Sequence, residues 1–414
     1  MKIVHINTSD KIDGTGIAAF RLHNAMIANG IDSKYLVLNK TIFDKKDIIS
    51  INHYLDRIKK RIFFVLENIT TRNMHKIKGV FSSFKYGFSL SRRQEIVEAE
   101  IIYLHLINTF INFYELENIL KTRKPVFWFL HDMFAITGGC HHSFDCKNYI
   151  TRCCKCSYNN KGRDLSIRQF KKKKKIYEKY KNLVFITPSK WLYDCVKKSD
   201  LTKNKQVYNI PNLIDIKLYK PYNRDLAREL FLLKNNVKII GFGASNALDN
   251  PYKGFSYFKD ALQILLNDDT LKDINIEVLI FGSNYSKEVE DNIPFKVNFL
   301  GHLYDDCSLI ILYNCMDVFV LPSLAESFGQ TAIESLACNV PVVGFNTGGI
   351  PDIVNENTGY LAEYKNSCDL AKGISFILKN KIENVSKYAE LFSVKTVLDK
   401  HIKIWNLGTK LNDI

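Results

Sequence analysis

Two series of short apolar runs dominate the pattern of hydrophobic and polar positions along this chain. The first series covers residues 2–6, 33–38, 100–105, 126–130, 183–188 and 207–211, and the second covers residues 237–242, 276–281, 297–300, 318–321 and 340–344. Segments with helical periodicity separate these runs, for example residues 17–29 and 189–196. Continuous apolar runs that alternate with helices are typical of parallel strands in doubly wound α/β sheets. The pattern therefore predicts two such sheets in succession.

A chain of 414 residues is too long for one ordinary core, so two domains are expected. We place the first domain at residues 1–215, a polar linker at 216–235, and the second domain at 236–390. The final segment, 391–414, is predicted to contain a helix that crosses back to the first domain. Residues 40–95 lack clean periodicity and are expected to form helices and a variable loop.

The composition is that of a globular protein, with 46% hydrophobic and 24% charged residues. No apolar stretch approaches the roughly 18 residues that a membrane span requires. The N-terminal segment MKIVHINTSD lacks the long apolar core of a signal peptide and instead resembles a first strand. These features predict a cytoplasmic protein.

The formal net charge of +15 is concentrated in the first half and includes the run Lys171–Lys175. Basic patches bind nucleic acid, but no zinc finger or RNA-recognition motif accompanies this one, so nucleic acid is not an expected partner. An anionic membrane surface would also attract such a run. The alternative is a solvated helix face in a lysine-rich chain, and the sequence leaves both interpretations open.

The most informative segment is residues 322–334, PSLAESFGQTAIE, which follows a buried strand and leads into a helix. It places Glu326 in the loop at the carboxyl end of the strand and Glu334 on the helix. Ligands of open α/β sheets bind at this edge, and a helix N-terminus favours phosphate. The amides expected to face the ligand are those of Phe328, Gly329 and Gln330. The arrangement suits a sugar nucleotide, although either glutamate alone would be an ordinary surface residue.

Residues 318–354, VFVLPSLAESFGQTAIESLACNVPVVGFNTGGIPDIV, resemble the C-terminal signature of family 4 glycosyltransferases. These are retaining enzymes, and the resemblance implies the GT-B architecture, in which two doubly wound Rossmann-like domains face a cleft. It also implies that Glu334 holds the nucleotide ribose and that Glu326 faces the donor sugar. Gly301 and His302 lie in the region that matches the family's base-contacting segment. Gly348 and Gly349 lie in a region that matches a loop lining the cleft.

Lys253 follows the first strand of the second domain and is expected to neutralise the leaving diphosphate. Most members of the family pair this lysine with an arginine a few residues earlier, but this chain has Ala244 and Ser245 there and no arginine after Arg228. Lys253 and the helix amides near Gly329 would therefore stabilise the phosphate charge. With these groups in place the chemistry requires no cofactor.

In the first domain, His131 stands at the carboxyl end of a strand and therefore at the expected cleft. A lone strand-end histidine is otherwise often structural, but the resemblance implies that His131 contacts the donor sugar. His105 and Asn108 match a neighbouring family segment less sharply. Gly14 and Gly16 are placed in the loop after the first strand, where glycine lets backbone approach a ligand or form a tight turn.

Four cysteines, Cys140, Cys146, Cys153 and Cys156, lie within a predicted insert at residues 138–160. Their spacing suits a structural zinc site, with Cys154, His141 or His142 as substitute ligands. The alternative is a set of ordinary reduced thiols. A subset of the resembled family carries a similar insert.

The resemblance implies a retaining glycosyltransferase of the hexosyltransferase type. Its donor would be a UDP- or GDP-sugar, and its acceptor a saccharide or lipid-linked saccharide in the synthesis of capsule or lipopolysaccharide. Such an enzyme is expected to be cytoplasmic and peripheral to the membrane. Two alternatives stay open: another GT-B enzyme such as a sugar-nucleotide epimerase, and a non-catalytic protein that binds sugar nucleotides or nucleic acid.

Overall fold

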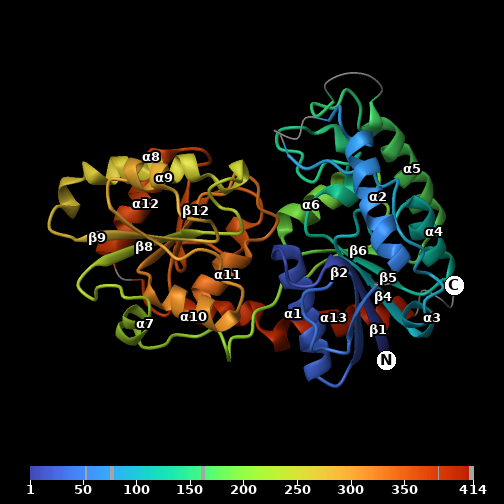
Figure 1. Cartoon of the computed structure of the whole chain (residues 1–414), viewed down its shortest axis with the longest axis horizontal. Helices are drawn as coiled ribbons and strands as arrows, with labels where there is room; N and C mark the ends of the chain where they lie inside the picture. The colour runs from blue at the N-terminus through green and yellow to red at the C-terminus, as the bar shows by residue number, and fades with distance from the viewer. Residues whose placement is uncertain (52–53, 75–78, 160–163, 381, 410–414) are drawn as a thin grey trace. The chain divides into compact units, whose positions relative to one another are not determined.

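A computed structural model of the protein describes residues 1–51, 54–74, 79–159, 164–380 and 382–409. The chain divides into two compact units (Figure 1). Unit 1 comprises Met1–Pro211 and the chain from Leu398 onward, and unit 2 comprises Asn212–Val397. Each unit contains one sheet in which every described strand pairing is parallel.

The sheet of unit 1 has seven strands in the order β3-β2-β1-β4-β5-β6-β7. Its strands are β1 (Lys2–Ser9), β2 (Asp32–Asn39), β3 (Ile48–Ser50), β4 (Ile101–Leu104), β5 (Val126–Phe129), β6 (Leu183–Thr187) and β7 (Val207–Asn209). Its helices are α1 (Gly14–Ala28), α2 (Tyr54–Thr70), α3 (Gln94–Glu98), α4 (Phe113–Lys121), α5 (Leu165–Lys179), α6 (Lys190–Lys198) and α13 (Val394–Thr409). A short 3-10 turn, η2 (Phe134–Ile136), precedes the cysteine-rich insert at residues 138–160, and another, η3 (Asn148–Ile150), lies within it.

The sheet of unit 2 has six strands in the order β10-β9-β8-β11-β12-β13. Its strands are β8 (Lys238–Gly243), β9 (Ile276–Phe281), β10 (Lys296–Phe299), β11 (Val318–Leu321), β12 (Val342–Phe345) and β13 (Gly359–Ala362). Its helices are α7 (Arg224–Leu230), α8 (Phe255–Leu266), α9 (Lys287–Asn292), α10 (Asp306–Cys315), α11 (Gln330–Ala337) and α12 (Ser367–Lys379). The 3-10 segments are η4 (Pro251–Lys253), η5 (Asp269–Leu271), η6 (Ile350–Asp352) and η7 (Val385–Phe392).

The apolar runs form the central strands because helices cover both faces of each sheet. Every residue of β4, β5 and β11 is buried, as the continuous apolar pattern predicted. Polar residues begin the intervening helices: the side chains of Asp13, Asn112, Ser189 and Asp305 accept hydrogen bonds from amides in the first turns of α1, α4, α6 and α10. The prediction of two doubly wound parallel sheets is confirmed.

The last helix packs within unit 1 through two aromatic residues. The Tyr103 hydroxyl lies 2.9 Å from Nδ1 of His401, and Trp405 Nε1 donates to the same hydroxyl at 2.7 Å. His401 and Trp405 are buried, with exposed fractions of 0% and 1%. This contact joins α13 to β4, which is far from it in sequence.

Candidate functional site

The order of strands in unit 2 reverses between β8 and β11, which are neighbours at the centre of the sheet. A ligand crevice forms at such a reversal, outside the carboxyl ends of the strands. The segment after β8 carries Lys253 in η4, and the loop after β11 carries Glu326. Two of the predicted catalytic residues therefore flank the position where this fold binds ligands.

These two side chains form an ion pair. Lys253 Nζ donates to Glu326 Oε2 at 2.9 Å, and their side chains are 23% and 17% exposed. The hydroxyl of Ser323 lies 3.4 Å from the same carboxylate oxygen. A partly buried pair interacts more strongly than a surface pair because less solvent screens it. The structure thus brings together the cation assigned to the phosphate and the carboxylate assigned to the sugar.

Two glycines let the neighbouring loops approach this pair closely. Gly254 has φ +69°, and a Cβ there would lie 1.9 Å from the carbonyl oxygen of Pro322. Gly348 has φ +57°, and a Cβ there would lie 2.0 Å from the carbonyl oxygen of Glu326. The Gly349 amide donates to that same carbonyl at 2.9 Å. Loops after three strands therefore fix the backbone on both sides of Glu326.

Helix α11 begins beside Glu326 without a side-chain cap. Its N-cap residue is Gly329, with φ 108°, and no side chain there accepts from the first turn. Ser327 Oγ and both polar atoms of the Gln330 side chain are buried and lack a hydrogen-bond partner among the described residues. Buried polar groups are rarely left unpaired in folded proteins. A phosphate could accept hydrogen bonds from the amides of this uncapped helix start, from the Ser327 hydroxyl and from Gln330 Nε2.

Glu334 lies on α11 and is 4% exposed. The hydroxyl of Tyr313 on α10 donates to its Oε2 at 2.9 Å. Hydrogen bonding to a fully buried tyrosine orients the carboxylate, which has further acceptor positions. The assignment of Glu334 to the nucleotide ribose stays a prediction.

The predicted base-contacting residues lie at the same edge of the sheet, after the outermost strand. Gly301 follows β10 and accepts a hydrogen bond at 2.7 Å from the Gly282 amide. The ring of His302 stacks on Tyr304, with centroids 6.1 Å apart. Their contact with a nucleotide base stays a prediction.

Arg228, the last arginine in the sequence, has a structural role. It is 2% exposed, and its guanidinium donates to Asp317 at 2.9 Å and to the carbonyl oxygens of Cys315 and Val237 at 3.0 and 3.1 Å. This arginine is therefore committed to the core of unit 2. Lys253 remains the residue that the sequence predicts to neutralise the phosphate charge.

The prediction for Gly14 and Gly16 requires a correction. We expected both in a loop, but they lie in the first turn of α1, and neither is among the glycines with positive φ. A Cβ at Gly16 would come within 2.9 Å of the Asp10 carbonyl oxygen, and the Gly16 amide donates to the Asp13 cap at 2.7 Å. Glycine is therefore required at position 16, where a larger side chain would clash with the Asp10 backbone at the helix start. A Cβ at Gly14 would meet open space, so no such requirement applies there.

In unit 1 the predicted His131 is the end of a row of histidines. His105 Nδ1 lies 3.0 Å from His131 Nε2, and His5 Nδ1 lies 3.0 Å from His105 Nε2. The rings stack pairwise with centroid distances of 5.3 Å. These residues come from β1 and from the ends of β4 and β5, which are adjacent strands. The sequence indicated His131 and, less sharply, His105, but not His5.

All three rings are neutral near pH 7. Desolvation by burial lowers the pKa of His131 to about 4, although the nearby Asp132 raises it. Burial, reinforced by repulsion from the other histidines, holds the pKa of His5 and His105 well below the usual 6.5. Neutral imidazoles donate one hydrogen bond and accept one, which suits hydroxyl groups better than phosphates.

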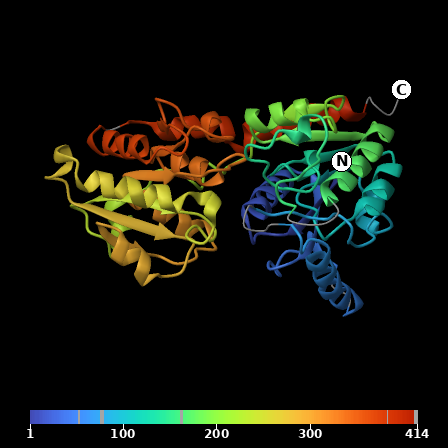
Figure 2. The same cartoon turned by 90° about the horizontal axis from the view of Figure 1, so that it is seen from above.

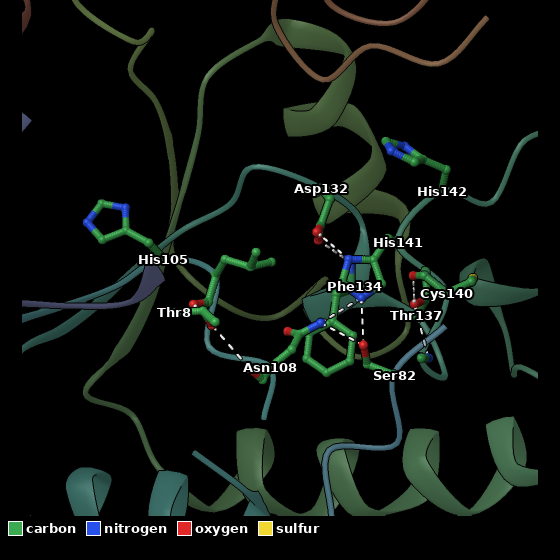
Figure 3. A network of polar contacts seen from close by, with 12 residues as sticks. Thr8, Ser82, His105, Asn108, Asp132, Phe134, Thr137, Cys140, His141 and His142 are labelled. Atoms are coloured by element: carbon green, nitrogen blue, oxygen red, sulfur yellow. Dashed lines mark hydrogen bonds and ion pairs between the residues drawn. The ribbon is translucent and has the colours of Figure 1, made fainter. Parts of the chain in front are cut away.

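A second polar network, missed by the sequence reasoning, branches from the residue after His131 (Figure 3). His141 Nδ1 donates to Asp132 Oδ2 at 2.6 Å. His141 Nε2 accepts from Asn108 Nδ2 at 2.6 Å and lies 2.9 Å from the hydroxyl of Ser82. The ring of Phe134 stacks on His141, with centroids 5.3 Å apart. His105 points away from this network in the figure, and its ring contacts His5 and His131 instead. We expected His141 as a substitute zinc ligand, whereas here it orients Asp132.

The predicted zinc ligands share one small cavity. Cys140, Cys146, Cys153, Cys154 and Cys156 all line a cavity of about 20 Å³, which is enough for one water-sized occupant. All five thiols are free. Burial raises the pKa of Cys140 to about 12 and also raises the pKa of Cys153 and Cys156. Among the described residues, no group of three or more His, Cys, Asp or Glu side chains is arranged to hold a metal ion.

The lysine run of α5 is not a uniform basic surface. Lys173 is fully buried, its ammonium group bonds to the carbonyl oxygens of Phe134 and Thr137, and it lies 3.7 Å from the centroid of the Phe134 ring. Its neighbours Lys171, Lys172 and Lys175 are exposed. In the part of the chain that the structure describes, no helix is long and apolar enough to cross a bilayer.

Comparison with known proteins agrees with this geometry. Residues 238–380 match the family model for glycosyl transferases of group 1. The capsular polysaccharide biosynthesis glycosyltransferase CapM of Staphylococcus aureus is 27% identical over 195 residues, which cover 44% of this chain and 49% of that protein. The chain thus spans about half the length of the curated relatives it matches.

Solved structures resemble the whole chain. Sucrose-phosphate synthase from Thermosynechococcus elongatus has a TM-score of 0.65 at 16% identity, covering 98% of this chain and 99% of that one. Anabaena HepE in complex with UDP-glucose has a TM-score of 0.62 at 16% identity, with the same coverage. Two doubly wound parallel units with these likenesses have the GT-B fold. Over the second sheet, residues 238–380 are similar to the group 1 glycosyl transferases.

Proposed function

We propose that the chain transfers a hexose-type sugar, with retention of configuration, from a UDP- or GDP-sugar to a saccharide or lipid-linked saccharide. The observation that carries the proposal is the Lys253–Glu326 ion pair at the strand reversal of unit 2, beside the uncapped start of α11. HepE, whose structure contains UDP-glucose, shares the fold, which supports a nucleotide-sugar donor.

Cleavage of the bond between sugar and diphosphate places negative charge on the phosphate and positive charge on the sugar. We assign the phosphate to Lys253 and to the amides of Phe328, Gly329 and Gln330, which are fixed donors that need little reorganisation. Glu326 faces the sugar, where its carboxylate favours the developing positive charge. The ribose is assigned to Glu334, and a sugar hydroxyl is assigned to the neutral ring of His131.

The acceptor would be part of a cell-surface polysaccharide, such as a capsule or lipopolysaccharide, or its lipid-linked precursor. Support comes from the relative CapM, which is named for capsular polysaccharide biosynthesis. A lipid-linked acceptor would place the protein at the cytosolic face of a membrane, as a peripheral protein.

We also propose that the cysteine-rich segment holds a structural zinc ion through Cys140, Cys146, Cys153 and Cys156. Their common cavity and free thiols support this assignment, and binding would draw the thiols together and deprotonate them. Metal analysis of purified protein should find about one zinc per chain. Cys153→Ser and Cys156→Ser should lose zinc and thermal stability, whereas Cys368→Ser, an exposed cysteine of unit 2, should change neither. Zinc-free protein of full stability would refute the assignment.

A panel of nucleotide sugars tests the proposed activity. The donor should raise the unfolding temperature of the protein, because a ligand that binds only the native state stabilises it. The same donor should release free nucleoside diphosphate when an acceptor is present. An epimerase would convert the sugar without releasing nucleoside diphosphate, and a non-catalytic protein would show the thermal shift alone.

A further inference from the structure

Helix α2 carries an apolar stripe that the described part of unit 1 does not cover. Leu55, Ile58, Ile62, Val65 and Ile69 are 62%, 41%, 49%, 54% and 54% exposed. They recur at alternating intervals of three and four residues, which places them on one face of the helix. In Figure 2, α2 is the blue helix that projects from the rest of unit 1.

The remaining faces of α2 explain why the stripe points outward. Glu67 accepts a hydrogen bond from the Ser83 amide at 2.6 Å and bonds to its hydroxyl. The ring of Phe63 packs on Phe88, with centroids 5.3 Å apart, and Thr70 bonds to the Tyr86 hydroxyl at 2.9 Å. These contacts hold one face of the helix against the unit. The apolar stripe is turned away from these contacts and stays exposed.

Basic residues flank the stripe. Arg57, Lys59, Lys60 and Arg61 are all exposed, whereas the acidic residues of the helix are Asp56 in the first turn and Glu67, which bonds to Ser83. An amphipathic helix with a basic flank is typical of elements that lie in the interface of an anionic membrane. Each basic side chain near such a surface adds attraction that salt weakens.

We propose that α2 is the element that docks this protein on an anionic lipid surface, with its apolar stripe inserted at the level of the headgroups. The inference rests on the proposed function only in that a lipid-linked acceptor would lie at this surface. An anionic lipid is the better occupant because its charge complements the exposed basic residues beside the stripe, whereas the same helix of a second copy carries the same basic excess. Within the run Lys171–Lys175, burial of Lys173 removes one of the charges available to lipid.

Vesicle flotation of the full chain tests the proposal without any donor or acceptor. Wild type should bind vesicles of phosphatidylcholine with phosphatidylglycerol, more tightly at low salt than at high salt. The variant Ile58→Gln/Ile62→Gln/Val65→Gln should bind at least about tenfold more weakly, because most of the inserted apolar area is lost. The variant Arg57→Gln/Lys59→Gln/Arg61→Gln should lose its preference for the anionic lipid.

A matched control removes exposed apolar residues elsewhere. Leu226, Leu230 and Leu266 in unit 2 are 59%, 69% and 54% exposed, and their joint substitution by Gln should leave vesicle binding unchanged. Absence of wild-type binding, or equal binding by the stripe variant, would overturn the proposal. So would a dimer that the stripe variant dissociates, since the stripe would then be occupied by a second copy. Release of UDP from UDP-glucose, measured without vesicles, reports separately on the proposed activity.

A second inference concerns the histidine row and is independent of α2. Beyond His5 the row ends at a sulfur atom, because His5 Nε2 lies 3.2 Å from Sδ of Met26. Met26 and His5 are each 0% exposed. A thioether accepts a hydrogen bond weakly and donates none. The hydrogen of neutral His5 is therefore expected on Nε2, which leaves Nδ1 as an acceptor.

This choice propagates along the row, since each neutral ring has one N–H. His105 must donate from Nε2 to His5 Nδ1, so its own Nδ1 accepts. His131 must then donate from Nε2 to His105 Nδ1. We infer that Met26, His5 and His105 act as positioning residues that fix His131 in the Nε2–H tautomer, leaving Nδ1 bare to accept a hydrogen bond from a substrate hydroxyl. The identity of that hydroxyl rests on the proposed function, whereas the tautomer does not.

The tautomer is measurable by NMR of the full chain labelled with 15N-histidine, with the His131 signals identified by their loss in His131→Gln. Wild type should show Nε2 protonated and Nδ1 bare at neutral pH. Met26→Leu conserves volume and removes the sulfur, so the opposite direction of donation should become populated and both tautomers of His131 should appear. Met74→Leu, a buried methionine in a different cluster, is the matched control and should leave His131 unchanged.

Two further variants separate hydrogen bonding from packing. His105→Gln retains one donor and one acceptor and should preserve the His131 tautomer, whereas His105→Phe keeps a ring without nitrogens and should not. A protonated Nδ1 on His131 in wild type would overturn the inference. An unchanged His131 spectrum in both Met26→Leu and His105→Phe would also overturn it.

Discussion

The two units share one strand order, to which unit 1 adds the edge strand β7, and they differ in the chemistry at the carboxyl ends of their strands. Both sheets are parallel and reverse strand order at their centre, between β1 and β4 in unit 1 and between β8 and β11 in unit 2. At that edge unit 2 places a charged pair, Lys253 and Glu326, beside a helix start. Unit 1 places neutral histidines there.

The difference shows what each edge is suited to bind. A cation and uncapped amides favour phosphate, while neutral imidazoles exchange hydrogen bonds with hydroxyl groups. Of the eight histidines among the described residues, only His302 lies in unit 2, and seven lie in unit 1. The same type of fold therefore carries a charged site in unit 2 and an uncharged, buried site in unit 1.

The largest expected effect that distinguishes the units is their response to acid. Burial lowers the pKa of His23 and His131 to about 4 and of His401 to about 3, and holds His5 and His105 well below 6.5. Between these values and pH 6.5 the unfolded chain binds more protons than the native one, so stability falls as pH falls. Each such group contributes about 1.4 kcal/mol per pH unit.

Together these histidines should lower the free energy of unfolding of unit 1 by on the order of 5 kcal/mol between pH 7 and pH 5.5. Hydrogen exchange resolved by peptide would measure this loss for each unit separately. Amides of unit 1 should lose protection on acidification before those of unit 2. Equal loss in both units would remove the electrostatic distinction between them.

Removing the cation of unit 2 should have the next largest effect, on activity. Lys253→Ala should lower kcat by about 10²- to 10³-fold, because a fixed donor to the developing phosphate charge is lost. Glu326→Gln should lower it comparably. Lys259→Ala on the neighbouring helix α8 is the control and should keep wild-type rates. Normal turnover by both site variants, followed as nucleoside diphosphate release, would show that the charged edge is not the reaction centre.

Lys173 sharpens the comparison because unit 1 fully buries a lysine, and burial lowers the pKa of its ammonium group. Desolvation lowers its pKa from 10.5 to about 7, so between these values the unfolded state binds the extra proton and stability rises with pH. Urea unfolding at pH 7, 8.5 and 10 should show this rise, up to roughly 4 kcal/mol. Lys173→Met should flatten the dependence. An unchanged slope in that variant would assign the effect to other groups.

The smallest expected effect concerns the orientation of Glu334. Tyr313→Phe removes its hydrogen bond within a buried environment and should destabilise unit 2 by about 1–3 kcal/mol. Nucleotide affinity, measured by calorimetry with UDP, should fall if the hydroxyl positions the carboxylate for ribose. Tyr360→Phe removes a different hydroxyl–carboxylate bond, to Asp369, and should leave UDP affinity unchanged.

The sequence predicted the sheets well because their central strands are continuous apolar runs. It missed β3 and β13, which are short, lie at sheet edges and are only partly buried. It placed Gly14 and Gly16 in a loop because glycine usually marks turns, whereas close packing against Asp10 decided the position of Gly16.

Candidate site residues can be proposed from the sequence where they lie close together in it, as Glu326 and Glu334 do. The pairing of Lys253 with Glu326 spans 73 residues and that of His5 with His105 spans 100, so neither contact is visible in local spacing. The burial of Lys173 could not be predicted from local sequence either, because its partners, the carbonyl oxygens of Phe134 and Thr137, are distant in the chain. Exposure of one face of α2 likewise depends on what the rest of unit 1 leaves uncovered.

The central claim is that the edge of unit 2 around Lys253 and the start of α11 receives a nucleoside diphosphate. Hydrogen exchange with and without UDP measures this directly, since bound phosphate would protect the amides that face it. We predict protection over Glu326–Glu334 and around Lys253. Binding of UDP that protects other segments, and leaves these two unchanged, would contradict the account.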